Sequence, residues 1–314
     1  MMTQPAIAML TPGQDRSPDR DQTGGPATLK SGAIQQQGTQ NVRTNMNPEY
    51  EVFAIRYATH DRTRRDNFIA GSDPHDASMP LDYFVWLIRR GSASWLVDSG
   101  FNAGMAHERS RQFLRCPIAS LLAAFGIHAS QVTDLIVTHL HYDHAGNLDL
   151  LPNARIHIQE REVHYATGCN MCKPIFRGAF AVEDVLQVVR GVYGDRVSFA
   201  HGDAQIAPGI ETYLIGGHTN GLQVVRVRTK RGWIVLASDG SHYYENMERQ
   251  APYPIVYHVG DMVQGWDRIA KLADSPRHIV PGHDPDVLRR YPPLANVPAD
   301  LTGEVVCLHE EPSR

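Results

Sequence analysis

Short apolar runs separated by turn-forming residues fill the chain from about Tyr50 onward. Residues 52–55 are rich in β-branched and aromatic side chains, which predicts a strand. Residues 83–88 and 94–97 flank an Arg-Arg-Gly-Ser turn and predict a β-hairpin. The same pattern predicts further strands at 135–138, 155–158, 212–215, 234–237 and 278–280.

Helical patterns alternate with these strands. Residues 118–125 predict a helix that ends before Gly126, a residue suited to a helix C-terminus. Two more helices are predicted at 159–166 and 182–192. The alternation indicates an α/β domain over residues 47–314. Residues 1–46 are rich in Gln, Gly, Pro, Thr and Ser, which predicts a disordered or extended N-terminal segment.

The strand at 135–138 leads directly into the sequence H-L-H-Y-D-H, residues 139–144. It places four metal-ligand side chains within six positions: His139, His141, Asp143 and His144. Imidazoles and carboxylates at this density suit zinc or a similar divalent ion. Histidines also cluster by chance, but such a cluster directly after a strand favours a metal site.

Three later strands each deliver one more ligand type just beyond the strand end: His218, Asp239 and His283. Taken alone, His218 would be read as a turn histidine. Loops held by a rigid sheet are where functional side chains are placed. Seven ligand types exceed the four of a closed zinc site, which predicts two metal ions with one bridging carboxylate. Such a pair can activate water and polarise a carbonyl or phosphoryl oxygen, so a hydrolase is predicted.

Composition limits the choice of partners. About 42% of the residues are hydrophobic and 20% charged, as in ordinary globular proteins, and the net charge is −4. There is no basic field for nucleic acid, no apolar run of about 20 residues for a membrane span, and no recognisable signal peptide. Four cysteines make no disulfide framework, so we expect a cytoplasmic protein.

The motifs H-L-H-Y-D-H-A-G-N, G-G-H-T, S-D-G and P-G-H resemble those of the metallo-β-lactamase superfamily, most closely its N-acyl homoserine lactonase branch. The resemblance covers roughly residues 83–288 and implies an αββα sandwich with the metals at one edge. It implies two zinc ions with these ligands: His139, His141 and His218 at the first, Asp143, His144 and His283 at the second, and Asp239 between them. Asp98 would orient a ligand histidine.

The resemblance also implies substrate contacts. In the lactonases a tyrosine three residues beyond the bridging aspartate binds the substrate carbonyl, whereas here that position is His242. Tyr243 and Tyr244 follow it, and we favour Tyr243 for this role with His242 as the competitor. Asp143 would assist departure of the ring oxygen. An apolar set in 171–180 would suit an acyl chain, or equally form core or a dimer surface: Met171, Ile175, Phe176 and Phe180.

The predicted function is therefore opening of a lactone ring, as a quorum-quenching N-acyl homoserine lactonase. A γ-butyrolactone or pyridoxolactone type of hydrolase, or a glyoxalase II-like thioesterase, would use the same ligands. A mono-iron persulfide dioxygenase expects an incomplete second site, and a non-catalytic scaffold expects lost ligands. Net charge disfavours a nuclease. A homodimer is expected by analogy only.

Other signals are weaker. Cys169 and Cys172 form a lone C-x-x-C with no second pair, which makes a metal or redox role unfavoured. The basic run at 226–231 predicts an edge hairpin with a solvated face. Four remaining histidines are interpreted as structural or surface residues: His157, His164, His201 and His258.

Overall fold

The structure is a computed structural model that describes residues 48–69, 76–109, 112–115 and 117–313. The predicted N-terminal segment, residues 1–46, lies outside the described residues, as does Cys116. The motifs predicted to carry the chemistry all lie within the described residues.

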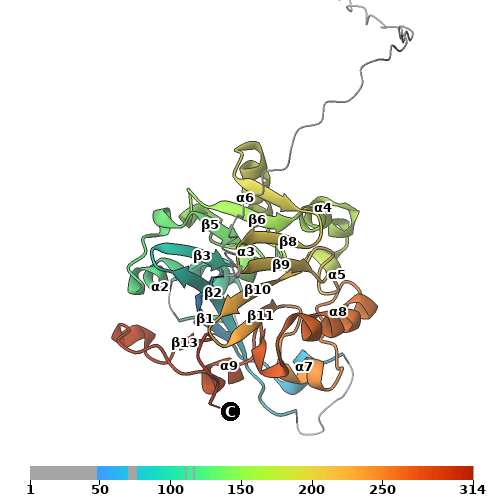
Figure 1. Cartoon of the computed structure of the whole chain (residues 1–314). Coiled ribbons are helices and arrows are strands. Elements are labelled where there is room, and N and C mark those ends of the chain that lie inside the picture. Colours follow the sequence, from blue (N-terminus) through green and yellow to red (C-terminus); the bar gives the residue numbers. More distant parts are fainter. Residues whose placement is uncertain (1–47, 70–75, 110–111, 116, 314) are drawn as a thin grey trace, which may run out of the picture. The chain divides into compact units, whose positions relative to one another are not determined.

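Two β-sheets form the centre of the fold (Figure 1). The first runs in the order β13 (Val305–Cys307), β1 (Glu51–His60), β2 (Leu81–Arg90), β3 (Ala93–Val97), β5 (Asp134–Ile136), β6 (Arg155–Gln159) and β7 (Val197–Ala200), with β4 (Gln112–Leu114) also paired to β1. The second runs in the order β12 (Ile279–Pro281), β11 (Gly232–Ser238), β10 (Gln223–Thr229), β9 (Ile210–Leu214) and β8 (Ala204–Ala207).

Alternating side chains bury both faces of the central strands. On β2, Phe84, Trp86 and Ile88 share one core with Val225 and Leu236 of the second sheet, so these residues hold the two sheets face to face. The intervening positions of β2 belong to a different core on the outer side of the first sheet. Continuous apolar runs in the sequence thus correspond to strands that are covered on both faces.

Helices cover the two outer faces. Leu121 and Leu122 of α2 (Ile118–Ala124) and Val188 of α6 (Val182–Tyr193) pack in the core outside the first sheet. Trp266 and Ile269 of α8 (Val259–Leu272) pack on the outer face of the second sheet, where Figure 1 shows α8 beside β11. The layers therefore follow the order helix, sheet, sheet, helix, and the predicted αββα sandwich is confirmed.

The remaining elements are short. The helices are α1 (Ala103–Glu108), α3 (Tyr142–Ala145), α4 (Glu160–Thr167), α5 (Pro174–Arg177), α7 (Tyr244–Glu248) and α9 (Asp286–Arg290). The 3-10 turns are η1 (Arg64–Asn67), η2 (Ala129–Gln131), η3 (Leu148–Leu150), η4 (Cys169–Cys172), η5 (Pro276–His278) and η6 (Ala299–Leu301). In the part of the chain that the structure describes, no helix combines the length and apolar character needed to cross a membrane.

Most predicted elements are present with shifts of a few residues at their ends. The hairpin forms from β2 and β3, and the helix predicted at 118–125 is α2, followed by Gly126 at φ +71°. One prediction is wrong in part: the basic run at 226–231 lies in a hairpin formed by β10 and β11, but this hairpin is not at the edge of the sheet. Its strand, β10, lies between β9 and β11, and Arg226 is held against Trp233, with the guanidinium carbon 4.0 Å from the ring centroid.

Replacing Leu236 with Ala tests the role of the core between the sheets. Leu236 is fully buried, so we expect Leu236→Ala to lower the free energy of unfolding by about 2–5 kcal/mol, measured by urea unfolding. The matched control is Leu186→Ala on the exposed side of α6, where the loss should stay below about 1 kcal/mol. Equal losses in the two variants would contradict the sandwich packing.

Candidate metal centre

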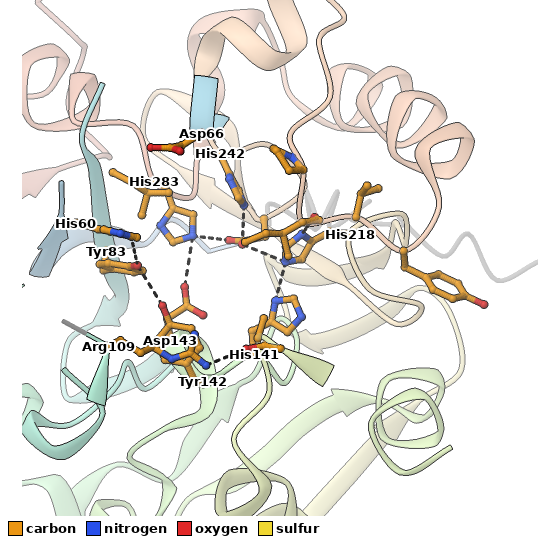
Figure 2. A pocket seen from close by; sticks show the side chains of 18 of the residues that line it. His60, Asp66, Tyr83, Arg109, His141, Tyr142, Asp143, His218, His242 and His283 are labelled. Atoms are coloured by element: carbon orange, nitrogen blue, oxygen red, sulfur yellow. Dashed lines mark hydrogen bonds and ion pairs between the residues drawn. The ribbon is translucent and has the colours of Figure 1, made fainter. Parts of the chain in front are cut away.

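The seven side chains predicted as ligands come from four separate loops, each beyond the end of a strand. His139 to His144 follow β5, His218 follows β9, Asp239 follows β11 directly and His283 follows β12. All seven are buried, and the structure brings them together at one edge of the sandwich. Figure 2 shows four of them, His141, Asp143, His218 and His283, turned toward one another.

A first cluster consists of His139, His141 and His218. The Nε2 atom of His218 lies 3.1 Å from Nε2 of His139 and 2.9 Å from Nδ1 of His141. Three ring nitrogens therefore point at a common centre. A second cluster consists of Asp143, His144 and His283, in which Oδ2 of Asp143 lies 3.5 Å from His144 Nε2 and 3.7 Å from His283 Nε2.

Asp239 lies between the two clusters and gives one carboxylate oxygen to each. Its Oδ2 atom is 3.2 Å from His218 Nε2 and 3.9 Å from His139 Nε2. Its Oδ1 atom is 2.9 Å from His283 Nε2 and 3.2 Å from His144 Nε2. Each carboxylate oxygen of Asp239 thus faces one of the two clusters.

In His218, His283 and His139, the ring nitrogen that points away from the clusters has a partner that orients the imidazole. Nδ1 of His218 is 2.7 Å from the carbonyl oxygen of Ile255, and Nδ1 of His283 is 2.8 Å from that of Asp82. Nδ1 of His139 is 3.1 Å from Oγ1 of Thr138. These contacts favour the tautomer that leaves the Nε2 lone pair facing the cluster, as in metal-binding histidines.

Asp98, which the resemblance implied would orient a ligand histidine, lies next to His144. Its Oδ2 atom is 2.7 Å from Nδ1 of His144, and it accepts hydrogen bonds from the backbone N–H and the hydroxyl of Thr138 at 2.7 and 2.8 Å. Asp98 is fully buried with φ +59°, a left-handed conformation that a non-glycine residue adopts at some cost. The carboxylate thus orients one ring of the second cluster and fixes the backbone just before His139.

The charges of the buried side chains within the centre favour binding of a cation. Burial acts to lower the pKa of His144, but the carboxylates of Asp143, Asp239 and Asp98 outweigh it and hold the pKa well above its usual value. Burial also acts to raise the pKa of Asp239, and the neighbouring histidines, His283 first, hold it well below its usual range instead. In the first cluster, burial lowers the pKa of His139 and His141 well below 6.5, which favours neutral imidazoles.

The donor set fits divalent metal ions. His144 Nε2 and Asp239 Oδ1 are buried side-chain atoms that make no hydrogen bond with the described residues. Native proteins rarely leave such atoms without a partner. Neutral imidazoles and two carboxylates are ligands that zinc and related borderline ions prefer. A cation at each cluster would satisfy these atoms together with the converging lone pairs.

A cavity of about 490 Å³ opens above the centre, within the size range of small-molecule sites (Figure 2). Its floor includes His141, Asp143, His218, Asp239 and His283. One wall is largely apolar and consists of Tyr165, Ile175, Phe176, Pro254, Ile255, Val256 and Tyr257. The cavity lining also includes a polar group of residues: His60, Arg62, Tyr83, Arg109 and Tyr142.

The four residues predicted as an acyl-chain surface divide into two groups. Ile175 and Phe176, at α5, line the cavity. Phe180 and Met171 are not among its lining residues. Phe180 packs against a ligand ring instead, with its centroid 4.6 Å from that of His141.

The candidates for the electrophilic group are also separated by the structure. His242 lines the cavity, with Nε2 3.0 Å from Oδ2 of Asp239 and its ring stacked 3.6 Å from the ring of Tyr253. Tyr243 is buried elsewhere, and its hydroxyl donates to the carbonyl oxygen of Pro80 at 3.2 Å. Tyr244 is packed under Arg290, 3.6 Å from the guanidinium carbon. Of these three side chains, only His242 lines the cavity.

Sequence reasoning missed several cavity residues. The Tyr83 hydroxyl lies 3.1 Å from that of Tyr142 and 3.3 Å from Nδ1 of His60. Arg109 stacks on Tyr142, with its guanidinium carbon 3.7 Å from the ring centroid. Tyr142 lies inside the H-x-H-x-D-H motif and could have been found there. Tyr83 reads only as one apolar position of a strand, and no local signal marks it as a cavity residue.

The weaker signals fall outside the cavity. Cys169 and Cys172 are exposed free thiols in η4. His157 pairs with Asp134 at 2.8 Å and His201 pairs with Glu160 at 2.8 Å. His258 accepts from the backbone N–H of Asp261 as the N-cap of α8, and His164 is largely exposed beside Glu160.

Comparison with known families decides the relationship. Residues 79–283 match the pattern of the Metallo-beta-lactamase superfamily. The chain belongs to the metallo-β-lactamase superfamily. The matched residues contain both clusters and Asp239, so the motifs that suggested this superfamily are the ones that form the centre.

Relatives within the superfamily include lactonases. An N-acyl homoserine lactonase of Bacillus cereus is 28% identical over 137 residues, which are 43% of this chain and about half, 49%, of that protein. A solved N-acyl homoserine lactone hydrolase with its product N-hexanoyl-L-homoserine bound at the catalytic metal centre has a TM-score of 0.64 at 20% identity, covering 78% of this chain and 96% of that chain. The dizinc quorum-quenching lactonase AidC has a TM-score of 0.61 at 15% identity, covering 76% and 89%.

Removing the Asp239 side chain tests the centre. Because Asp239 gives an oxygen to each cluster, we expect Asp239→Ala to lose most of its bound metal, measured by elemental analysis of gel-filtered protein. Its hydrolytic activity should be lost together with the metal. Asp267→Ala, an exposed aspartate on α8, is the matched control and should keep its metal. Full metal content in Asp239→Ala would contradict the assignment.

Proposed function

We propose that this chain is a metal-dependent lactonase that opens the ring of N-acyl homoserine lactones. The observation that carries the proposal is the position of Asp239 between two complete clusters on the floor of a cavity with an apolar wall. The lactonase relatives support it, but their match spans only about half of their length, so the activity is a proposal for the whole chain.

The first and second clusters would each hold one divalent ion, zinc being the ion that their donors favour. Such ions supply Lewis-acid polarisation of a carbonyl and a lowered pKa for water. Both clusters are complete, which argues against a mono-iron oxidoreductase and against a scaffold that has lost its ligands. The count and identity of the ions are part of the proposal.

In ring opening, a water oxygen bonds to the ring carbonyl carbon, and the bond from that carbon to the ring oxygen breaks. The proton lost by water ends on the ring oxygen, so the product is a hydroxy acid. Asp143, a member of the second cluster, lines the cavity, and we propose that its carboxylate relays this proton. This is the role that the resemblance implied for Asp143, which is to assist departure of the ring oxygen.

His242 is proposed as the side chain that faces the substrate carbonyl. Its ring is fixed by stacking on Tyr253, which lowers the cost of orienting a hydrogen-bond group toward developing negative charge. Tyr243, which we favoured from the sequence, has its hydroxyl directed to the backbone of Pro80. The cavity therefore supports the competitor.

The acyl chain would lie along the apolar wall that includes Ile175, Phe176 and Tyr257. This wall supports a lactone with an apolar tail over an unsubstituted γ-butyrolactone or a pyridoxolactone. Quorum quenching, a cytoplasmic location, a homodimer and a separate N-terminal segment at residues 1–46 stay predictions.

A lactone panel tests the proposed substrate class. Zinc-loaded protein is assayed by acid release with N-hexanoyl and N-decanoyl homoserine lactone, γ-butyrolactone, pyridoxolactone and a glutathione thioester. We expect kcat/KM to be highest for the acylated lactones, because their acyl chains can lie along the apolar wall. A higher value for the thioester or for the unsubstituted lactone would overturn the proposal. In protein purified without added metal, an elemental analysis that shows one iron per chain and no zinc would revive the dioxygenase alternative.

Substitution at position 242 distinguishes the two candidates for the carbonyl contact. We expect His242→Phe to lower kcat by about 10²–10³-fold with metal content retained, because a group facing the oxyanion is lost. His164→Phe, at a largely exposed histidine of α4, is the matched control. If Tyr243→Phe instead loses turnover while His242→Phe keeps it, the assignment is reversed.

A further inference from the structure

Glu162 is a buried carboxylate that the reaction described above does not use. It lies on α4, the helix that follows β6, and its exposed fraction is 0%. Its hydrogen-bond partners among the described residues are uncharged backbone N–H groups and a hydroxyl. A buried carboxylate is costly unless hydrogen bonds satisfy its oxygens, so its partners are informative.

Three donors satisfy Glu162, and all of them come from loops that carry ligands. Its Oε1 atom accepts from the backbone N–H of Leu140 at 2.9 Å. Its Oε2 atom accepts from the Thr219 hydroxyl at 2.7 Å and from the backbone N–H of Gly221 at 2.9 Å. Burial raises the pKa of Glu162, and these hydrogen bonds act to lower it.

The positions of these donors connect the two halves of the first cluster. Leu140 stands between His139 and His141, and Thr219 directly follows His218. One carboxylate therefore joins the loop beyond β5 to the loop beyond β9. The second cluster has no corresponding contact with Glu162 among the hydrogen bonds of the described residues.

A close approach of the backbone strengthens this connection. A Cβ atom added at Gly221 would lie 2.2 Å from the backbone nitrogen of Glu162, a distance that no side chain can accept. Glycine at this position thus lets the His218 loop reach the start of α4. The two loops and the helix meet at a single point.

We propose that Glu162 is a positioning residue: it fixes the separation of the two loops that carry the first cluster and thereby sets the metal affinity of that cluster. The inference rests on the proposed metal-binding role of the first cluster, but not on the choice of a lactone as substrate. Groups that orient ligands from behind typically change metal affinity by about 10–100-fold when they are altered.

Zinc affinity of the full-length protein tests the proposal. Metal-free wild type and Glu162→Gln are titrated with zinc against a chromophoric chelator, and near-ultraviolet circular dichroism and urea unfolding report the fold. A glutamine has one acceptor oxygen, so its amide N–H groups would face at least one of the three donors. Glu160→Gln, at a half-buried glutamate two residues earlier on the same helix, is the matched control.

We expect wild type and Glu160→Gln to bind two zinc ions, and Glu162→Gln to bind one of them about 10–100-fold more weakly. The other ion should lose less affinity, because Glu162 makes no hydrogen bond to the loop of His283 and contacts the segment beyond β5 at Leu140, before Asp143 and His144. Unchanged affinity for both ions, with only a lower free energy of unfolding, would show a purely structural role and overturn the inference.

Two further results, a variant that does not fold and a wild type that binds no zinc, are also informative. If Glu162→Gln does not fold, Thr219→Val replaces it, since this change removes one donor and leaves the carboxylate; a loss of about 3–10-fold at one zinc site is then expected, and no loss overturns the inference. If wild type binds no zinc, the proposed metal centre itself is overturned. Failure confined to the Glu162 and Thr219 variants leaves the proposed function standing.

Discussion

The sharing of the Asp239 carboxylate between two clusters is the interaction on which the centre depends. One oxygen faces the histidines of the first cluster and the other faces those of the second. Two hydrogen bonds fix the loop that carries Asp239. The Tyr253 hydroxyl donates to the backbone carbonyl of Asp239, and the Trp266 indole donates to the backbone carbonyl of Gly240 at 2.7 Å. The outer helix α8 therefore contributes directly to the position of the bridging group.

The sandwich makes such a shared carboxylate achievable. Strands β11 and β12 run parallel, so their following loops meet at one edge, and the core between the sheets fixes that edge relative to β5. Two buried residues at this edge, Asp98 and Ser238, have φ of +59° and +45°. Conformations of this kind cost of order 1–3 kcal/mol each, and they cluster where surrounding structure imposes a functional geometry. The stability of the packed sheets offsets this local cost.

The strands and the metal-ligand residues could be predicted from the sequence, because both leave a signal in neighbouring positions. Apolar runs covered on both faces, such as residues 83–88, carry their own signal, and each ligand is adjacent to its strand end. Contacts made across the fold carry no local signal, so Tyr83 in the cavity wall and Glu162 behind the first cluster were not found. The choice between His242 and Tyr243 depended on side-chain direction after Asp239, which neighbouring positions in a sequence do not reveal. The edge position expected for residues 226–231 was wrong because strand order within a sheet is a long-range property.

The central claim is that one carboxylate joins two occupied metal positions, and anomalous diffraction tests it most directly. Crystals of the full-length protein grown with zinc should show two anomalous peaks at the zinc edge, one in each cluster, each about 2.0–2.2 Å from a different oxygen of Asp239. A single peak, or two peaks of which one does not touch Asp239, would contradict the account.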